Sequence, residues 1–164
     1  DPLTGLANRP MLHSELNRAV AATRRSGRPT AVLMIDLDHF KAVNDSLGHS
    51  EGDAVLVAAA RRLESSVRGG DLVARLGGDE FVIVMRDLDD PSGALALAER
   101  VNQRFREPLS TDSAVARTTA SIGVALTSPD AEGTDILRDA DRALYRAKGA
   151  GRDRAVLFQP IPDV

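Results

Sequence analysis

The sequence predicts an α+β fold in which helices cover a mixed β-sheet. Apolar runs of strand length alternate with longer segments in which apolar residues recur at helical spacing, and two of the short runs are joined by a pair of glycines. The chain has 164 residues, of which 43% are hydrophobic and 27% are charged. These values are typical of one globular domain with a buried core. We therefore expect residues 1–164 to form a single domain.

The expected elements follow one another without repeats or low-complexity segments. Helices are expected from the N-cap Asn8 to about Arg25, over residues 40–47, from Gly52 or Asp53 to about Val67, over 92–105 and over 134–148. Strands are expected over residues 30–38, 71–74, 81–84, 115–126 and 155–158. The run at 30–35 is apolar throughout, which predicts a strand that is buried on both faces.

The two glycines at positions 77 and 78 are expected to form a tight turn between the second and third strands. Glycine enters positive φ without steric cost, and its missing side chain leaves room for a ligand. Asp79 and Glu80 would then begin the third strand with their side chains on opposite faces. At most one of them could align with a given carboxylate on a neighbouring strand.

Neighbouring carboxylates are expected from the end of the first strand. Asp36 and Asp38 are two residues apart, so they share a face, and one or both could meet Asp79 across the sheet. Magnesium is bound by one or two protein carboxylates together with substrate phosphates and water. The pattern therefore indicates nucleotide phosphate chemistry, with solvated strand ends as the structural alternative.

Composition excludes several other classes of function. The formal net charge of −3 and a pI near 5.6 show no basic excess, which argues against polymeric nucleic acid as a partner. The absence of cysteine excludes disulfides and thiolate metal sites and is compatible with the cytoplasm. No apolar stretch approaches the ~20 residues of a membrane span, so we expect no direct membrane contact by this domain. Because the first residue is Asp1, we expect a piece of a longer protein.

Several segments together resemble the GGDEF domain, the catalytic module of diguanylate cyclases. The matching segments are residues 1–9 (DPLTGLANR), 36–41 (DLDHFK), 44–49 (NDSLGH), 52–53 (GD), 77–81 (GGDEF), 120–125 (ASIGVA), 140–148 (ADRALYRAK) and 151–152 (GR). The resemblance covers nearly the whole chain. It departs at Asp153, where the family commonly has Asn.

This resemblance implies a fold and a reaction. The fold would be a ferredoxin-like βαββαβ core, akin to those of nucleotidyl cyclases and polymerase palms. The reaction would be condensation of two GTP into cyclic di-GMP with release of pyrophosphate. Each domain would bind one GTP and two domains would face each other, so that catalysis requires a homodimer.

The resemblance also implies the residues of the catalytic centre. Asp36, the Leu37 carbonyl and Asp79 would bind Mg²⁺, with Mn²⁺ as an alternative ion. Glu80 would be catalytic, acting either in metal binding or in proton removal. Gly77 and Gly78 complete the signature turn, which we count with the catalytic residues. In-line phosphoryl transfer depends mainly on positioning and charge neutralisation, so no nucleophilic side chain is required.

Lysine usage supports the implied triphosphate site. Of 21 cationic residues, only Lys41 and Lys148 are lysine, and both fall within the matching segments. Such exceptions can mark positions that need a compact ammonium, although codon bias would also explain them. The family pattern places Lys41, Lys148 and Arg152 at the triphosphate. Backbone N–H groups around residues 38–40, which include His39 and Phe40, would add anion binding.

Guanine recognition is assigned to Asn44 and Asp53 by the same resemblance. A carboxylate can accept the adjacent N1–H and N2–H₂ donors of guanine, which adenine lacks. Without the surrounding pattern, Asp53 would be read as a favourable charge in the first turn of a helix, and Asn44 as a turn former.

Arg68 and Asp71 match the inhibitory product site of the family, because five residues separate Asp71 from Gly77. We therefore expect feedback inhibition by cyclic di-GMP, although Gly69 and Gly70 could simply end a helix. A silent module that senses GTP or cyclic di-GMP, and a cyclase with another base preference, are the alternative functions. The family pattern also implies a regulatory domain upstream, a phosphodiesterase domain downstream as a further option, and a parent protein that could be anchored in the membrane.

Overall fold

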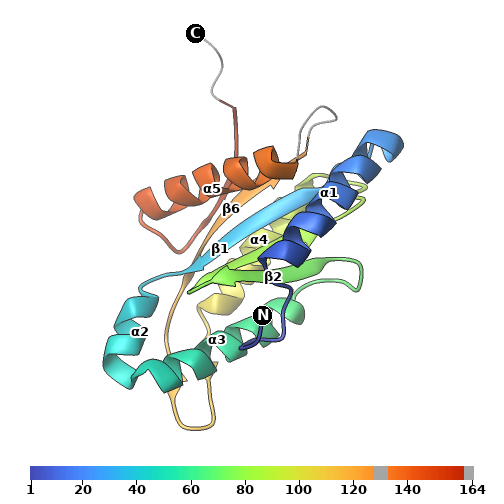
Figure 1. Cartoon of the computed structure of the whole chain (residues 1–164). Helices are drawn as coiled ribbons and strands as arrows, with labels where there is room; N and C mark the ends of the chain where they lie inside the picture. Colours follow the sequence, from blue (N-terminus) through green and yellow to red (C-terminus); the bar gives the residue numbers. More distant parts are fainter. Residues whose placement is uncertain (128–132, 161–164) are drawn as a thin grey trace.

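The computed structural model describes residues 1–127 and 133–160, which form a five-stranded sheet with helices on both faces (Figure 1). The strand order is β2-β3-β1-β6-β7, and every neighbouring pair is antiparallel except β6 and β7. The strands of this sheet are β1 (Ala31–Leu37), β2 (Leu72–Gly77), β3 (Glu80–Met85), β6 (Ala120–Leu126) and β7 (Ala155–Leu157). The helices are α1 (Arg9–Ser26), α2 (Phe40–Leu47), α3 (His49–Glu64), α4 (Ser92–Phe105) and α5 (Gly133–Gly149).

This order confirms the predicted α+β class and the ferredoxin-like core. The first four strands of the large sheet, β1, β2, β3 and β6, lie in the order β2-β3-β1-β6, with α2 and α3 before β2 and α4 before β6. The helix α5 and the parallel strand β7 extend this core on the β6 side. No helix within the described ranges is both long and apolar enough to cross a membrane.

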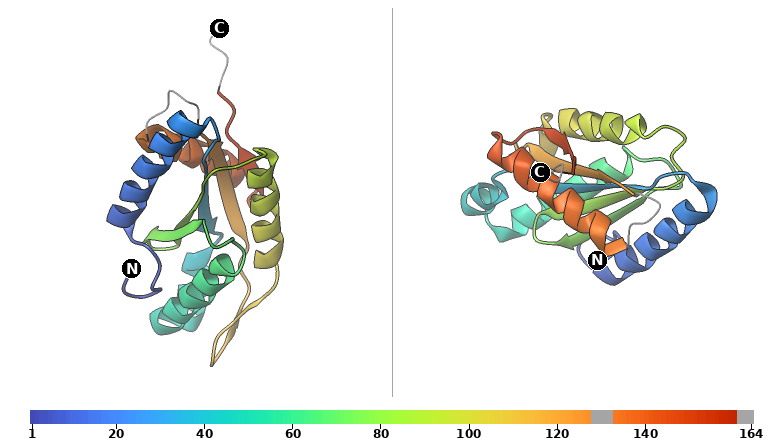
Figure 2. Two further views of the ribbon diagram at one scale, coloured as in Figure 1. Left: turned by 90° about the vertical axis from the view of Figure 1, so that its right-hand side faces the viewer. Right: turned by 90° about the horizontal axis from the view of Figure 1, so that it is seen from above.

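Two apolar layers enclose the sheet. The helices α1 and α5 cover one face, and α3 and α4 cover the other (Figure 2). All residues of β1 are buried, as predicted. Alternate residues of β1 serve different layers: Val32 and Met34 pack with α1 and α5, whereas Leu33 and Ile35 join the layer of α3 and α4. The next residue in the first series, Asp36, therefore points toward the α1 and α5 side.

The first helix forms as its sequence predicts. The Asn8 side chain accepts a hydrogen bond from the Met11 backbone N–H (3.1 Å), and Gly27 ends the helix with φ of 72°. Pro10 lies in the first turn, where a missing N–H costs nothing.

The start predicted for the third helix at Gly52 or Asp53 is wrong. The helix α3 begins at His49, and Gly48, with φ of 85°, is the only residue between α2 and α3. Gly52 lies inside α3 and does not mark the start of the helix. Its missing side chain makes room for Asn44, since a Cβ at position 52 would be 1.8 Å from Asn44 Oδ1. The helix also ends at Glu64, earlier than the predicted Val67.

The strand predicted over residues 115–126 is divided. A small two-stranded sheet pairs β4 (Leu109–Ser110), which was not predicted, with β5 (Val115–Ala116). The strand β6 starts only at Ala120. Between them, the hydroxyls of Thr118 and Thr119 bond to Asp38, so this segment connects to the end of β1.

Candidate active site

The signature turn is shifted by one residue from its predicted position. The strand β2 continues through Gly77, and the turn residues are Gly78 and Asp79. The pairing register shifts between Arg75 and Gly77, which leaves one extra residue in β2, and Gly77 and Gly78 have φ of 140° and 52°. The φ of Gly77 requires glycine, and the left-handed φ of Gly78 favours it. It places Asp79 in the turn and Glu80 at the start of β3.

The predicted carboxylates meet at this end of the sheet. Glu80 lies directly opposite Asp36 in the antiparallel pair of β3 and β1, and the Leu37 N–H donates to the Asp79 carbonyl (3.3 Å). Negative charge on both Asp79 and Glu80 raises the pKa of Asp36. Of the two acids, only Glu80 is aligned with Asp36 in the strand pairing, and the expectation that Asp79 also begins the strand is wrong, because Asp79 is in the turn.

Lys148 contacts the same carboxylate. It lies in the last turn of α5, and its Nζ is 2.8 Å from Asp36 Oδ2. Burial of Asp36 raises the pKa of its carboxyl group, while the hydrogen bond and positive charge of Lys148 act in the opposite direction. The net direction is upward, so burial and the neighbouring acids outweigh the lysine.

Asp38 does not join these acids, contrary to one of the arrangements that its spacing allowed. Its carboxylate is buried and accepts hydrogen bonds from the Thr119 hydroxyl (2.6 Å), the Ser121 hydroxyl (2.7 Å) and the Asp153 N–H (3.1 Å). These partners occupy both carboxylate oxygens. Asp38 therefore connects β1 to β6 and to the loop after α5, and Asp36 alone faces the signature turn.

The loop that carries Arg152 has an unusual backbone. Gly151, Arg152 and Asp153 have φ of 108°, 63° and 47° in succession. The Asp153 carboxylate accepts hydrogen bonds from Asn102 Nδ2 (3.1 Å) and Arg106 Nε (3.0 Å). Asn and Asp are the residues that tolerate the left-handed conformation best after glycine. Asp153, which replaces the Asn that the family commonly has, therefore also suits this left-handed conformation.

The two residues assigned to guanine lie on consecutive helices. Asn44 is on α2 and Asp53 is on α3, and the two helices pack together. The closest approach involves Gly52, whose missing Cβ leaves room for the Asn44 amide. Asp53 is exposed and is therefore accessible to a ligand.

The remaining residues assigned to phosphate lie around the start of α2. Lys41 and His39 are exposed, whereas Phe40 is buried in the core beneath them. His39 adopts a left-handed conformation with φ of 58°. The backbone N–H of Asp38 donates to the Thr119 carbonyl (2.8 Å), so it is not free for the expected anion binding. Any such binding would depend on the N–H groups that follow.

Arg75 was missed by sequence reasoning. Its Nε and Nη2 donate to the Gly78 carbonyl at 3.0 and 2.8 Å, and its Nη1 lies 3.1 Å from Asp1 Oδ2. The Asp1 carboxylate also accepts from the N–H and hydroxyl of Thr4. The N-terminal motif therefore holds the signature turn through one arginine. An arginine two residues before Gly77 was the available signal.

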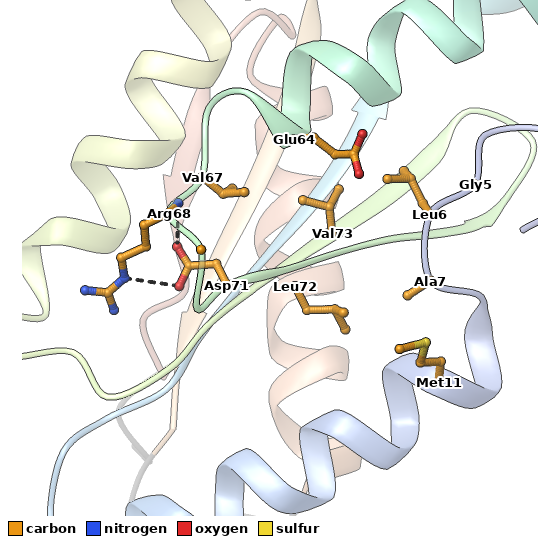
Figure 3. A pocket seen from close by; sticks show the side chains of 11 residues that line it. Gly5, Leu6, Ala7, Met11, Glu64, Val67, Arg68, Asp71, Leu72 and Val73 are labelled. Atoms are coloured by element: carbon orange, nitrogen blue, oxygen red, sulfur yellow. Dashed lines mark hydrogen bonds and ion pairs between the residues drawn. The ribbon is translucent and has the colours of Figure 1, made fainter.

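Arg68 and Asp71 form a pair at the rim of a separate pocket of about 420 Å³ (Figure 3). Arg68 Nε is 3.3 Å from Asp71 Oδ1, and the Arg68 backbone N–H lies 3.3 Å from the other carboxylate oxygen. The Asp71 side chain is only 2% exposed, whereas that of Arg68 is 56% exposed. The pocket also has apolar walls, which are formed by Leu6, Met11, Val67, Leu72 and Val73.

The residues at the end of β1 fit a divalent cation when substrate is included. Within residues 1–127 and 133–160, no three His, Cys, Asp or Glu side chains gather closely enough to hold a metal ion by themselves. Magnesium commonly uses only one or two protein carboxylates and takes its other ligands from phosphates and water. Asp36 and Asp79, with the Leu37 carbonyl, can supply such a partial set, and the Lys148 ammonium shows that Asp36 accepts a cation.

Comparisons with known proteins agree with this fold and site. The family described as "Diguanylate cyclase, GGDEF domain" matches residues 1–154, so the chain belongs to the GGDEF family. The bifunctional diguanylate cyclase/cyclic di-GMP phosphodiesterase MucR of Pseudomonas aeruginosa is 41% identical over 160 residues, which is 97% of this chain and 23% of MucR. The chain therefore spans about a quarter of the length of this relative.

Solved structures of isolated domains match over nearly their full length. The GGDEF domain of TpbB from Pseudomonas aeruginosa has 39% identity and a TM-score of 0.92, with 97% of this chain and 94% of that chain covered. The GGDEF domain of DgcB from Caulobacter crescentus, in complex with c-di-GMP, has 31% identity and a TM-score of 0.90, with 98% and 93% covered. The chain thus has the fold of these isolated GGDEF domains over nearly its whole described length.

Proposed function

We propose that this domain is a diguanylate cyclase, which condenses two GTP into cyclic di-GMP and pyrophosphate. The observation that supports this most directly is the convergence of Asp36, Asp79 and Glu80 at one end of the sheet, with Lys148 beside them. Intact acids in the signature turn favour catalysis over a silent nucleotide-binding role. Diguanylate cyclase TpbB, whose isolated domain has the same fold, adds support from the comparisons.

Three groups of residues have distinct parts in the proposed reaction. Asn44 and Asp53 select guanine, and the cations Lys41, Lys148 and Arg152 hold the triphosphate. Asp36, Asp79 and the Leu37 carbonyl hold Mg²⁺ or Mn²⁺, which when bound polarises the α-phosphate and favours ionisation of the attacking 3′-hydroxyl. Glu80, opposite Asp36, contributes to metal binding or accepts the proton. The bulge at Gly77 and Gly78 leaves the phosphates room to approach the backbone.

The proposed reaction requires two domains. Cyclic di-GMP forms when the 3′-hydroxyl of each GTP attacks the α-phosphate of the other and pyrophosphate leaves from both. One domain provides one guanine site and one set of phosphate ligands, so it holds half of the reacting pair. A homodimer with facing sites completes the centre, and the rate should rise faster than linearly with protein concentration while the dimer is sparse.

Product inhibition is proposed for the Arg68 and Asp71 pair. Arginine can bind phosphate or the acceptor edge of guanine, and a carboxylate can accept from the guanine N1–H and N2–H₂ groups. The Asp71 carboxylate is mostly buried and paired with Arg68, so binding of guanine to it would compete with this pair. Arg68→Ala should weaken inhibition by added cyclic di-GMP at least tenfold and leave initial turnover of GTP near the native rate. Unchanged inhibition would contradict the assignment.

The function is tested by chromatography of products from GTP, ATP and an equal mixture, each with Mg²⁺. A diguanylate cyclase yields cyclic di-GMP from GTP alone, and the Asp79→Ala, Glu80→Ala variant yields none. A mixed dinucleotide would indicate a different base preference. Binding of GTP or cyclic di-GMP without turnover would indicate the silent sensing module instead.

The setting of the domain in a larger protein is also a proposal. MucR is described as a bifunctional diguanylate cyclase and phosphodiesterase, and it is about four times as long as the matched segment. We infer a regulatory domain before this chain, with a phosphodiesterase domain after it as a further option. We also infer a cytoplasmic setting, because GTP, the proposed substrate, is supplied there.

A further inference from the structure

The ion pair between Lys148 and Asp36 joins two residues whose proposed roles differ. Nζ of Lys148 lies 2.8 Å from Asp36 Oδ2, and the side chains are 33% and 12% exposed. Among the charged groups that act on Asp36, Lys148 is the cation, whereas Asp79 and Glu80 are anions. Lys148 therefore neutralises part of this acidic site.

This contact conflicts with the ligand-bound arrangement. A metal ion that coordinates the same carboxylate oxygen would occupy the position of the ammonium group, and the two positive charges would repel each other at this distance. In the proposed complex, Lys148 instead serves the triphosphate. A metal ion on Oδ2 and the Lys148 ammonium cannot share that position, so the lysine has to leave Oδ2 when the ion binds there.

We propose that Lys148 is an internal counter-ion that blocks Asp36 against divalent cations until a nucleotide enters. The triphosphate then draws the ammonium away from Asp36, and the cation binds together with the nucleotide rather than before it. This inference rests on the proposed metal role of Asp36 and the proposed phosphate role of Lys148. It assigns Lys148 a second role, in the order of binding.

Lysine suits such an exchange better than arginine would. Its ammonium group is compact and sits on a flexible four-carbon stem, so it can change partners without the fixed geometry of a guanidinium fork. Lys148 lies in the last turn of α5 and is one-third exposed, which leaves its side chain free on one side. Asp36, by contrast, is fixed within the sheet between β3 and β6.

Lys41 provides a matched comparison. It is the only other lysine, it belongs to the same proposed triphosphate site, and it is exposed. No hydrogen bond or ion pair connects it to the carboxylates among the residues that the structure describes. Replacing either lysine with alanine changes the net charge equally, but only Lys148→Ala removes the partner of Asp36.

The proposal is tested by Mn²⁺ binding to the nucleotide-free domain, measured from the electron paramagnetic resonance signal of free Mn²⁺. Lys148→Ala should bind Mn²⁺ about tenfold more tightly than the native domain, since a partly buried cation beside the ligand is removed. Lys41→Ala should remain within about twofold of the native affinity. Adding Asp36→Asn to Lys148→Ala should abolish the gain, because the ligand itself is lost.

Equal or weaker Mn²⁺ binding by a folded Lys148→Ala variant, or no detectable binding by either protein, would overturn the proposal. A gain of the same size in Lys41→Ala would also overturn it, because the effect would then come from net charge alone. Circular dichroism establishes folding. Cyclic di-GMP production separates the two hypotheses. Production without a Mn²⁺ effect rejects the exchange alone. A Mn²⁺ effect without production, even from the domain fused to a dimeric coiled coil, rejects the cyclase function.

Discussion

Arg75 connects the N-terminal motif to the signature turn: its Nη1 lies 3.1 Å from Asp1 Oδ2, and its Nη2 donates to the Gly78 carbonyl at 2.8 Å. The Arg75 and Asp1 side chains are only 11% and 15% exposed, so the pair is shielded from water. Movement of the N-terminal segment would therefore displace the turn that carries Asp79.

This contact predicts an energetic coupling between Arg75 and Asp1. Arg75→Gln and Asp1→Asn should each reduce the free energy of unfolding, and their interaction energy should be about 1–2 kcal/mol, as for a shielded charged hydrogen bond. Urea denaturation of the two single variants and the double variant measures it. Cyclic di-GMP production should fall in all three. Purely additive free energies would show that the contact does not hold the turn.

Gly52 predicts a specific effect on guanine binding. A Cβ at this position would be 1.8 Å from Asn44 Oδ1, and the amide can rotate away, so Gly52→Ala should displace Asn44 without unfolding the domain. We expect the KM for GTP to rise about tenfold, because one hydrogen bond to the base is lost. The melting temperature should stay close to that of the native domain. Asn44→Ala should give a similar KM. A native KM in Gly52→Ala would contradict the assignment of Asn44.

Replacing Asp36 with asparagine should stabilise the domain in a pH-dependent way. Burial, followed by the neighbouring acids Asp79 and Glu80, raises the pKa of its carboxyl in the folded state. The protonated Asp36 carboxyl therefore favours the folded state. This contribution to the free energy of unfolding is fully present below about pH 4 and is lost as the pH rises through the folded-state pKa. Asp36→Asn cannot ionise, so it should be more stable than the native domain at pH 7, although inactive.

The stability gain of Asp36→Asn should shrink as the pH falls toward 4, where the native carboxyl is also protonated. Urea denaturation of both proteins across this range provides the measurement. Glu64→Gln is a suitable control, because Glu64 is exposed at the end of α3. Lower stability of Asp36→Asn at pH 7 would mean that the Lys148 ion pair outweighs burial.

Gly123 predicts a requirement for close packing of α5. A Cβ on this β6 residue would lie 2.1 Å from the Ala140 carbonyl oxygen and 2.2 Å from the Leu144 nitrogen, both backbone atoms of α5. Gly123→Ala should therefore destabilise the domain by about 3 kcal/mol or more and move Lys148 away from Asp36. The control Gly93→Ala, in open space within α4, should change stability by no more than about 1 kcal/mol. Equal effects of the two substitutions would contradict this account.

Arg62 connects α3 to the end of α4, and this connection should stabilise the domain. Its guanidinium donates to the carbonyls of Arg104, Glu107 and Pro108 at 2.8, 2.6 and 2.7 Å. Arg62→Ala should cost about 2–3 kcal/mol because acceptors at a helix end lose their partner. Arg61→Ala, on the exposed side of α3, should cost less than about 0.5 kcal/mol by the same denaturation assay.

The sheet and most of its helices could be predicted because their apolar residues recur with clear periods. The start of α3 could not, because Gly52 serves packing against Asn44 and resembles a helix end only in sequence. The turn position depended on a bulge in β2 that no local pattern reveals. These errors arise where tertiary contacts, and not local preference, decide the conformation.

The candidate site was predictable in composition but not in detail. Asp36 and Asp38 are two residues apart at the end of β1, so spacing alone does not distinguish them. The Thr119 and Ser121 hydroxyls and the Asp153 N–H bind the Asp38 carboxylate and keep it out of the site. The contact of Lys148 with Asp36 joins residues from distant parts of the chain, so spacing could not predict it. The resemblance to the GGDEF family supplied their grouping, and the structure supplied their partners.

The most direct test of the cyclase function is conversion of GTP with Mg²⁺ over a range of protein concentrations, with cyclic di-GMP followed by chromatography. The proposed centre predicts product that rises faster than linearly with protein concentration and disappears in Asp79→Ala. Fusion to a dimeric coiled coil should raise the rate at low concentration. No product from the native domain, even in the fused dimer, would contradict the cyclase function and favour a nucleotide-sensing module.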